Sequence, residues 1–344
     1  MSNNYNYNNS SKVIKVAING FGRIGRMVFR AGFDDENIEF LAINDLTDTK
    51  TLAYLLKNDS VHGKFLHEVS FDEQHLIIDG KYIRVYAERD PEALPWKDHD
   101  IDVAIESTGF FRTRELLEKH LRAGAKKVLL SAPAKSNDVK TIVVGVNEHL
   151  IIPEDTIISN ASCTTNSLAP IVKVLNDNYG IEHGFMTTIH SYTGDQKLVD
   201  APNKDLRRGR SAAINIVPTT TGAAVAVTKV IPELQGKLDG VAVRVPTPDG
   251  SLTDFVCKLK KSTTKEEINW LFNEVSKNHM KGILHYSEDP LVSSDIVGDN
   301  CSTILDAKNT KVIDGSFIKI MTWYDNEWGY SNRMIDLVKL MMKK

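Results

Sequence analysis

A cysteine and a histidine have the residue types and local settings to act together on a carbonyl compound. Cys163 lies in the polar stretch Ser159 to Asn166, which follows the β-prone run Asp155 to Ile158 and precedes apolar residues spaced for a helix. A thiol at a helix N-terminus lies beside unpaired N–H groups and a positive dipole end, which predicts a lowered pKa and a nucleophile. Isolated cysteines are more often small buried hydrophobic residues, but the polar neighbours of Cys163 argue against that alternative.

His190 is the candidate base for this thiol. It ends a predicted strand, Gly184 to His190, and precedes the polar loop Ser191 to Asp195. An imidazole can take the thiol proton near neutral pH and then hold the thiolate as an ion pair. A histidine after a strand is more often a structural hydrogen-bonding residue, and the sequence separation does not fix the distance from Cys163. The pair is therefore a hypothesis.

Three stretches of the second half could bind an anion. Pro218 to Gly222 places hydroxyls and a glycine before a helical run, as in an anion nest, although threonine-rich turns also serve as ordinary caps. Arg244 lies inside an apolar strand, where an unpaired cation is costly, so it needs a protein carboxylate or a ligand phosphate. Asp205 to Arg210 is a basic cluster, and for Arg207 and Arg210 we expect a solvated or subunit-facing role.

A glycine turn near the N-terminus predicts a dinucleotide site. The apolar run Val13 to Asn19 leads directly into Gly20, Gly22 and Gly25, in the order strand, glycine turn, helix. In this fingerprint the first glycine permits a tight turn, the second lets the backbone approach a pyrophosphate, and the third lets the helix pack on the strand. The pattern alone is weak, because glycine turns are common.

Asp45 strengthens the prediction. It follows the next predicted strand, Ile38 to Asn44, at the distance where an acid accepts hydrogen bonds from the ribose hydroxyls and repels a 2′-phosphate. The residue therefore predicts NAD as the cofactor in preference to NADP. A plain turn residue is the alternative for Asp45.

The elements that must position these residues alternate as in a doubly wound sheet. The predicted strands that follow Asn44 are Glu68 to Phe71, His75 to Ile78, Tyr82 to Tyr86, Ile101 to Glu106, Lys127 to Ser131 and Thr141 to Val144. Helices are predicted at Arg23 to Gly32, Thr49 to Leu56, Thr113 to Ala123 and from Cys163 to about Asn178. Near the C-terminus, a strand over Phe317 to Trp323 precedes a final helix.

Length and composition restrict the number of domains, the class of partner and the compartment. The 344 residues suggest two domains, and 42 basic against 45 acidic residues give a net charge of −3, so neither a nucleic-acid nor a membrane surface is expected as the main partner. Three widely separated cysteines are typical of a reducing compartment and of neither a disulfide framework nor a zinc cluster, so we expect a cytoplasmic protein without a metal site. The Asn-rich residues 1–12 are predicted to be a disordered tail, with docking on a neighbouring subunit as the less favoured alternative.

Four stretches together resemble one known family. Asn19 to Arg26, Ser159 to Asn166, His190 to Thr193 and Trp323 to Tyr330 match, in order, the motifs of phosphorylating glyceraldehyde-3-phosphate dehydrogenases, and the resemblance extends from about Lys12 to Lys344. It implies an α/β protein with an N-terminal Rossmann doubly wound sheet and an α+β catalytic domain whose sheet is largely antiparallel. The implied boundaries are 13–162 for the NAD-binding domain, completed by a C-terminal helix over 327–344, and 163–326 for the catalytic domain.

The resemblance also implies a role for each site residue. Cys163 would be the nucleophile and His190 its base. The substrate phosphate and inorganic phosphate would be bound by Ser162, Thr164, Thr193, Arg208, Thr221, Gly222 and Arg244. NAD would be bound by Gly20, Gly22, Arg23, Ile24, Gly25, Asp45, Arg89, Thr108, Ser131, Asn326 and Tyr330. A homotetramer is implied, in which the loop around Tyr192 to Asn215 approaches a neighbour's cofactor site.

The implied activity is oxidation of glyceraldehyde 3-phosphate to 1,3-bisphosphoglycerate with NAD and inorganic phosphate through a cysteine thioester. An erythrose-4-phosphate dehydrogenase, which releases its acyl group to water, is the alternative, and nucleic-acid binding is expected only as a secondary activity. The sequence departs from many relatives at Gly194, at Ser167, where a second cysteine is common, and at the bulky pair Phe110-Phe111. None of these departures removes a reacting group.

Overall fold

The computed structural model describes residues 13–343, and these residues form two compact units. The first unit comprises residues 13–142, 148–161 and 331–343, and the second comprises 143–147 and 162–330. The tail predicted over residues 1–12 lies outside the described residues.

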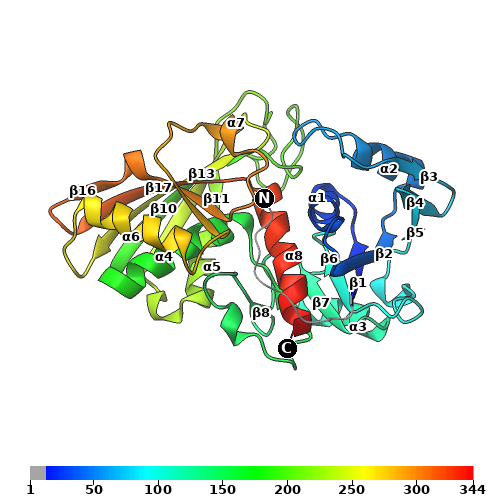
Figure 1. The fold of residues 1–344 in the computed structure, drawn as a ribbon. Helices are drawn as coiled ribbons and strands as arrows, with labels where there is room; N and C mark the ends of the chain where they lie inside the picture. The colour runs from blue at the N-terminus through cyan, green and yellow to red at the C-terminus, as the bar shows by residue number, and fades with distance from the viewer. Residues whose placement is uncertain (1–12, 344) are drawn as a thin grey trace. The chain divides into compact units, whose positions relative to one another are not determined.

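The first unit is built on a nine-stranded sheet with the order β3-β4-β5-β2-β1-β6-β7-β9-β8 (Figure 1). Seven strands from β5 to β8 pair in parallel, and β4 and β3 extend the sheet antiparallel. The strands are β1 (Ile14–Asn19), β2 (Ile38–Asn44), β3 (Val69–Phe71), β4 (His75–Ile78), β5 (Lys81–Tyr86), β6 (Val103–Glu106), β7 (Lys127–Leu130), β8 (Lys140–Thr141) and β9 (Ile157–Ser159). Strands β6 and β9 are buried at every position, and β1 and β7 at all positions but one, which explains why they read as apolar runs.

Helices accompany this sheet in the alternating order that the sequence predicts. They are α1 (Arg23–Gly32), α2 (Thr49–Lys57), α3 (Arg114–Arg122) and α8 (Trp328–Lys343), with short 3-10 helices at Pro91–Ala93 and Glu148–Leu150. Asp48 caps α2 by accepting a hydrogen bond from the Thr51 N–H. The end of α8 is fixed to the unit by Lys339, which pairs with Asp35 at 2.8 Å. A Rossmann-like parallel sheet is therefore confirmed.

One strand prediction is wrong. Thr141 to Val144 reads as a strand, but only Lys140 and Thr141 pair with β9. The chain turns at Val143, whose N–H donates to Asn147 Oδ1 and whose carbonyl accepts from the Val146 and Asn147 N–H groups. These local bonds replace the ladder that would have continued the strand.

The second unit is built on an eight-stranded sheet with the order β11-β12-β10-β13-β17-β15-β14, and β16 pairs with β17. The pairing is antiparallel except for β10 with β12 and β14 with β15, so a mostly antiparallel second sheet is confirmed. The strands are β10 (Ile181–Ser191), β11 (Val217–Thr220), β12 (Leu238–Val245), β13 (Ser251–Leu259), β14 (Leu284–Ser287), β15 (Thr303–Asp306), β16 (Lys311–Ile313) and β17 (Phe317–Tyr324).

The long helix α4 (Cys163–Tyr179) packs on strands β10, β13, β15 and β17 of this sheet. It continues through Pro170 and buries most of its first three turns. The other helices of the unit are α5 (Ala223–Val230), α6 (Lys265–Lys277), α7 (Ser293–Ile296) and 3-10 turns at Pro232–Leu234 and Ala307–Asn309. α6 begins with a capping box, because Thr264 and Glu267 bond each other's backbone N–H groups.

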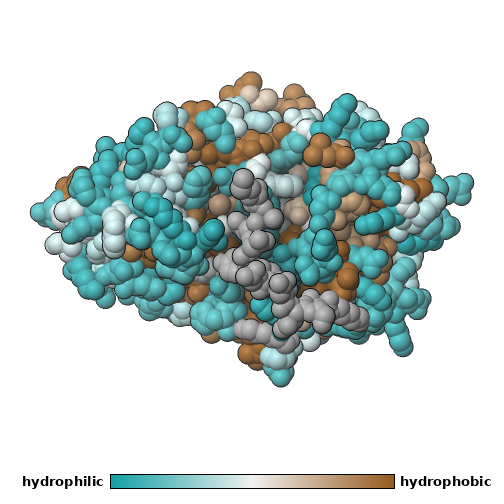
Figure 2. Space-filling view, in the orientation of Figure 1, coloured by the Kyte–Doolittle hydropathy of each residue, from teal (hydrophilic) through white to brown (hydrophobic). Residues whose placement is uncertain are grey.

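Hydrophilic side chains cover much of the face in Figure 2, with hydrophobic side chains gathered in separate patches. Among the described residues, no helix is both long enough and apolar enough to cross a membrane.

Candidate active site

Cys163 is the first residue of α4. Ser162 caps the helix, because its Oγ accepts a hydrogen bond from the Thr165 N–H at 3.1 Å. The residue before the cap, Ala161, has φ 56°, a left-handed conformation that costs roughly 1–2 kcal/mol for a residue with a Cβ. A sharp, strained turn therefore separates β9 from α4 and presents Cys163 at the helix N-terminus, as the sequence predicts.

The structure brings His190 to Cys163. His190 is the penultimate residue of β10, and its Nε2 lies 3.5 Å from Cys163 Sγ. The imidazole is 5% exposed and meets the Tyr324 ring edge-on at 5.9 Å between centroids. The two reacting groups hypothesised from the sequence are therefore within hydrogen-bonding distance, a contact that their spacing along the chain could not establish.

The pKa shifts of the pair differ from the prediction. Burial raises the pKa of the Cys163 thiol above its ordinary value, although the charge of Arg244 and hydrogen bonds with Thr164 oppose the rise. The expected lowering of this pKa is therefore wrong for the free protein, because desolvation outweighs the helix N-terminus. Burial, followed by Arg244, lowers the pKa of His190 to about 3.

Arg244 lies beside His190 because β10 and β12 pair in parallel with these two residues in register. Its Nη1 lies 2.8 Å from His190 Nδ1, 2.9 Å from the Ser191 carbonyl oxygen and 3.3 Å from Thr193 Oγ1. Its Nε is buried without a hydrogen-bond partner, and among residues 13–343 no carboxylate forms a salt bridge with this guanidinium. The cation that needs an anion is therefore poised beside Thr193 with its pairing incomplete.

Arg208 has different partners. It pairs with Asp195, donates through Nε to Thr219 Oγ1 at 3.0 Å, and donates through Nη2 to the Thr220 carbonyl at 3.3 Å. Asp195 also accepts a hydrogen bond from Thr193 Oγ1. The carboxylate of Asp195 therefore links Arg208 to Thr193, which in turn contacts Arg244.

The hydroxyls predicted to hold inorganic phosphate lie at the starts of two helices in contact, α4 and α5. Thr164 Oγ1 shares a hydrogen bond with the Tyr324 hydroxyl at 2.9 Å, so this side chain is engaged in the free protein. Thr221 Oγ1 accepts from the Ala223 N–H at 3.2 Å, and Gly222 is the N-cap residue of α5. Helix N-termini and hydroxyls are suitable ligands for a phosphate.

The glycine turn of the first unit fits a dinucleotide. Gly20 has φ +92°, and a Cβ there would lie 2.6 Å from the Thr108 nitrogen. A Cβ at Gly25 would lie 2.1 Å from the Gly20 carbonyl oxygen, so α1 can pack on β1 only with glycine. A Cβ at Gly22 would meet nothing within 4 Å, which leaves open space where a pyrophosphate could approach the backbone.

Asp45 is oriented by this same turn. Its Oδ2 accepts a hydrogen bond from the Phe21 N–H at 2.8 Å, and its Oδ1 accepts from the Thr47 N–H at 3.0 Å. The carboxylate predicted to bind ribose therefore also ties the glycine turn to the end of β2.

The remaining predicted cofactor residues lie in both units. In the first unit Arg23 pairs with Asp59, Ile24 is half-buried, Arg89 is exposed, and Ser131 follows β7. In the second unit Asn326 Oδ1 accepts hydrogen bonds from Ser191 and Ser251, both at 2.7 Å, which turns its amide NH₂ group away from these hydroxyls, and Tyr330 is buried in α8.

A buried polar network underlies the cofactor turn and was not predicted. The Glu106 carboxylate, which is 0% exposed, accepts hydrogen bonds from Asn19 Nδ2 at 2.5 Å, the Thr108 N–H at 2.8 Å, the Thr108 hydroxyl and His120 Nε2 at 3.1 Å. Trp96 Nε1 donates to His120 Nδ1 at 3.0 Å, which places the imidazole proton on Nε2. Glu106 ends β6 and Asn19 ends β1, so the network joins the two strands at their carboxyl ends.

Two further residues of the second unit escaped the sequence analysis. Tyr324 bonds Thr164 and Thr188 through its hydroxyl, and Asp195 pairs with Arg208. Tyr324 lies within a motif that carries the family resemblance, so its position could have suggested a role. No spacing rule indicates the contact of Asp195 with Arg208 or that of Glu106 with Asn19, because these partners lie 13 and 87 residues apart in the chain.

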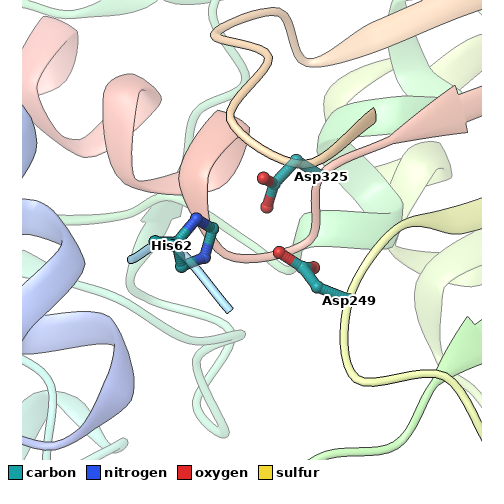
Figure 3. Close-up of side chains that lie close together, drawn as sticks. All are labelled: His62, Asp249 and Asp325. Carbon is teal, nitrogen blue, oxygen red and sulfur yellow. The ribbon is translucent and has the colours of Figure 1, made fainter. Parts of the chain in front are cut away.

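Asp249 and Asp325 form a buried acid pair. Both are 1% exposed, and Figure 3 shows their carboxyl groups pointing toward one another. Burial and the neighbouring Asp249 raise the pKa of Asp325. Backbone N–H groups of Gly298, Glu327 and Trp328 donate to Asp325 at 2.6–2.8 Å, which fixes the carboxyl group where α8 begins.

Comparison with known protein families identifies the class of protein to which the chain belongs. Residues 14–114 match the NAD-binding domain, and residues 162–326 the C-terminal domain, of glyceraldehyde 3-phosphate dehydrogenase. A Rossmann-like unit with its glycine turn and Asp45, together with a unit that pairs a thiol with an imidazole, defines an NAD-dependent oxidoreductase.

Full-length relatives give the family. The chain is 59% identical over 331 residues to the glyceraldehyde-3-phosphate dehydrogenase of Thermotoga maritima, and 55% identical over 332 residues to that of Geobacillus stearothermophilus. Each alignment covers 96% of this chain and 99% of the relative. The chain belongs to the glyceraldehyde-3-phosphate dehydrogenase family.

Proposed function

We propose that the protein oxidises D-glyceraldehyde 3-phosphate to 1,3-bisphosphoglycerate with NAD and inorganic phosphate, through a thioester on Cys163. The observation that carries the proposal is the 3.5 Å approach of His190 Nε2 to Cys163 Sγ, beside the incompletely paired Arg244. A thiol suits the reaction because a thioester retains enough free energy to pass its acyl group to phosphate.

In the first chemical step His190 Nε2 takes the thiol proton and Sγ attacks the aldehyde carbon. The Cys163 backbone N–H at the start of α4 donates a hydrogen bond to the developing oxyanion, and the protonated imidazole transfers its Nε2 proton to that oxygen, which becomes a hydroxyl. When bound, NAD supplies the hydride acceptor. His190 next accepts the hydroxyl proton of the adduct as the carbonyl forms again, and the thioester remains on Sγ.

Phosphate contacts determine the substrate in this proposal. Arg244 and Thr193 hold the substrate phosphate, and Arg208 completes the positive field from its position on Asp195. Ser162, Thr164, Thr221 and Gly222 hold the attacking inorganic phosphate at the starts of α4 and α5. Retention of all four favours phosphate over water as the acyl acceptor, and so favours this reaction over an erythrose-4-phosphate dehydrogenase.

We also propose a cytoplasmic homotetramer. The loop between β10 and β11 carries exposed apolar side chains, which a partner subunit would cover. The three widely separated cysteines support a cytoplasmic location. These side chains are Leu198, Val199, Leu206, Ile214 and Ile216, each more than two-thirds exposed.

The test is NADH formation from glyceraldehyde 3-phosphate and from erythrose 4-phosphate, each with inorganic phosphate varied. We expect glyceraldehyde 3-phosphate to be preferred and its steady turnover to require phosphate. Faster, phosphate-independent turnover of erythrose 4-phosphate would overturn the proposal in favour of the alternative. Cys163→Ser serves as the inactive control.

A further inference from the structure

The single proton of the Thr193 hydroxyl is already engaged in the free protein. Thr193 Oγ1 lies 2.5 Å from Asp195 Oδ1 and 3.3 Å from Arg244 Nη1. A carboxylate can only accept a hydrogen bond and a guanidinium can only donate one. The hydroxyl proton therefore points at Asp195, and the Thr193 oxygen accepts from Arg244.

Asp195 is held as a charged acceptor beside this hydroxyl. Its Oδ2 pairs with Arg208 Nη1 at 2.5 Å. The Gln196 N–H donates to the Thr193 carbonyl at 3.0 Å, which closes a turn that keeps Thr193 and Asp195 together. Although burial opposes the shift, the hydrogen bond from Thr193 and the two nearby arginines lower the pKa of Asp195. The carboxylate is therefore ionised and fixed near neutral pH.

A phosphate ester requires the same proton. Above about pH 7 the ester is mainly a dianion, because its second pKa is about 6. Its terminal oxygens can then only accept hydrogen bonds, as the Asp195 carboxylate does. If Thr193 binds the phosphate, its proton must turn from Asp195 to the ligand. One hydrogen bond is then given up for the one that forms.

Asp195 can give up this bond without becoming an isolated charge. Arg208 stays paired with Oδ2, and the Asp195 side chain is 45% exposed, so water can replace Thr193. Arg244 can donate to Thr193 Oγ1 in either state, because the hydroxyl oxygen has two lone pairs. The exchange is therefore possible, and its cost reduces the affinity for phosphate.

We propose that Asp195 is a positioning residue that weakens phosphate binding by holding the Thr193 proton away from the ligand. The inference rests on the proposed function, in that Thr193 binds the substrate phosphate. The substrate and the acyl-phosphate product carry this same phosphate, so tighter binding of it would stabilise both and would not raise kcat. Asp195 thus limits the affinity for a group that the product must release.

Asp195→Asn is the variant that separates the two roles of the carboxylate. The amide should turn its oxygen to Arg208 and its NH₂ group to Thr193, because a guanidinium can only donate. Thr193 Oγ1 then accepts from the amide, and its proton is free for a phosphate. The substitution therefore keeps the two contacts of Asp195 and removes its claim on the proton.

Calorimetric titration of the full-length protein with glycerol 3-phosphate tests the inference. This ester carries the phosphate but has no aldehyde, so the measurement does not depend on the reaction. At pH 8 with saturating NAD, we expect Asp195→Asn to lower the Kd about fivefold, the effect of one hydrogen bond that is no longer given up. An unchanged or higher Kd would overturn the inference, because a purely structural role of Asp195 predicts weaker binding.

Asp205→Asn is the matched control. Asp205 lies 3.5 Å from Arg208 Nε and is 37% exposed, and among residues 13–343 it forms no hydrogen bond with Thr193. We expect its Kd to change by less than about twofold, the effect of a partly exposed charge. If it lowered the Kd as much as Asp195→Asn, loss of negative charge and not release of the Thr193 proton would be the cause, and the inference would fail.

Thr193→Val completes a double-mutant cycle. If Asp195 acts through the Thr193 proton, Asp195→Asn should change the Kd by less than about twofold once that hydroxyl is absent. A fivefold decrease in the Thr193→Val background would show that Asp195 acts on the phosphate directly by its charge. That result would also overturn the inference.

Failure of the proposed function would be distinguishable from failure of the inference. If glycerol 3-phosphate binds but the NADH assay shows no phosphate-dependent oxidation, the proposed reaction is wrong and the cycle still decides the role of Asp195. If neither the wild type nor Asp195→Asn binds glycerol 3-phosphate, the assignment of Thr193 to the phosphate site is wrong and the inference fails with it.

Discussion

The two buried histidines that contact site residues are held in opposite ways. His120 donates to Glu106 and accepts from Trp96, so each ring nitrogen has one partner of the correct kind. His190 has one nitrogen before Cys163 and the other between Arg244 and Ser191, which require opposite protonation. The first arrangement satisfies both ring nitrogens at once, whereas in the second Nδ1 can bond only one of its two neighbours at a time.

This difference matches the tasks of the two regions. A cofactor platform benefits from fixed geometry, and the saturated network around Glu106 fixes the strand ends that carry the glycine turn. A nucleophile and its base must change protonation during each turnover, so a saturated network would hinder them. Substitutions in the first region should therefore reduce stability and cofactor affinity, whereas those in the second should reduce rates.

The largest effect is expected for His190→Asn. Loss of the base should slow acylation by about 100-fold or more, the usual range for a general base, with little change in folding. A stopped-flow burst of NADH measures this step. His183→Asn, an exposed histidine on the same strand, should leave the burst unchanged. A normal burst in His190→Asn would show that His190 is not the base in acylation.

Arg244→Leu should separate two substrates. Without its charge-assisted hydrogen bonds, kcat/KM for glyceraldehyde 3-phosphate should fall by about 10- to 100-fold, which corresponds to roughly 1.5–3 kcal/mol. Turnover of unphosphorylated glyceraldehyde should change little, because this substrate has no phosphate for Arg244 to bind. Steady-state kinetics on both substrates decide, and equal losses would mark Arg244 as a structural residue.

Glu106→Gln tests the saturated network. The amide would present a donor to groups that already donate, so we expect a loss of about 1–3 kcal/mol in the free energy of unfolding and weaker NAD binding. Urea unfolding and calorimetric titration with NAD measure the two effects.

The matched pair for this test is at His120. His120→Gln can still donate to Glu106 and accept from Trp96, whereas His120→Leu can do neither. The leucine variant should be clearly less stable than the glutamine variant. Equal stabilities would show that packing, and not the hydrogen bonds, holds this region.

The smallest effect is expected for Asp45→Ala. The ratio of kcat/KM for NAD to that for NADP should narrow by up to about tenfold, mainly through weaker NAD binding, as one or two hydrogen bonds are lost. Asp48→Ala is the control, since it removes only the cap of α2 and should leave the ratio unchanged. An unaltered ratio in Asp45→Ala would show that this acid serves the turn alone.

The sequence predicted most of the fold because its signals are local. Alternating apolar runs and glycine turns gave the Rossmann-like sheet within a residue or two at most strands. A strand was wrongly predicted over Thr141 to Val144, because the Asn147 side chain closes a turn there by accepting a hydrogen bond from the Val143 N–H. The pattern of apolar residues carries no sign of this bond. Boundaries set by tertiary hydrogen bonds are invisible to such patterns.

The site was predictable by residue type and not by protonation state. Cys163, His190 and Arg244 stand out as a thiol before a helix, a histidine after a strand and an arginine within one. The pKa of the thiol was predicted in the wrong direction, because burial depends on segments distant in the chain. The contact of Arg244 with His190 Nδ1 arises from the register of β10 and β12, which only the folded sheet defines.

The facing carboxyl groups of Asp249 and Asp325 make folding depend on proton activity. A carboxyl whose pKa is higher in the folded than in the unfolded chain favours folding in acid, and this contribution is lost as pH rises from the ordinary value of 3.8 through the folded pKa. The free energy of unfolding should therefore decline between about pH 4 and 8. Asp249→Asn, which removes the like charge and offers Asp325 a donor, should flatten this decline and add roughly 1 kcal/mol near neutrality. Thermal unfolding of both proteins across that range measures the linkage, and parallel curves would show that the pair takes up no proton on folding.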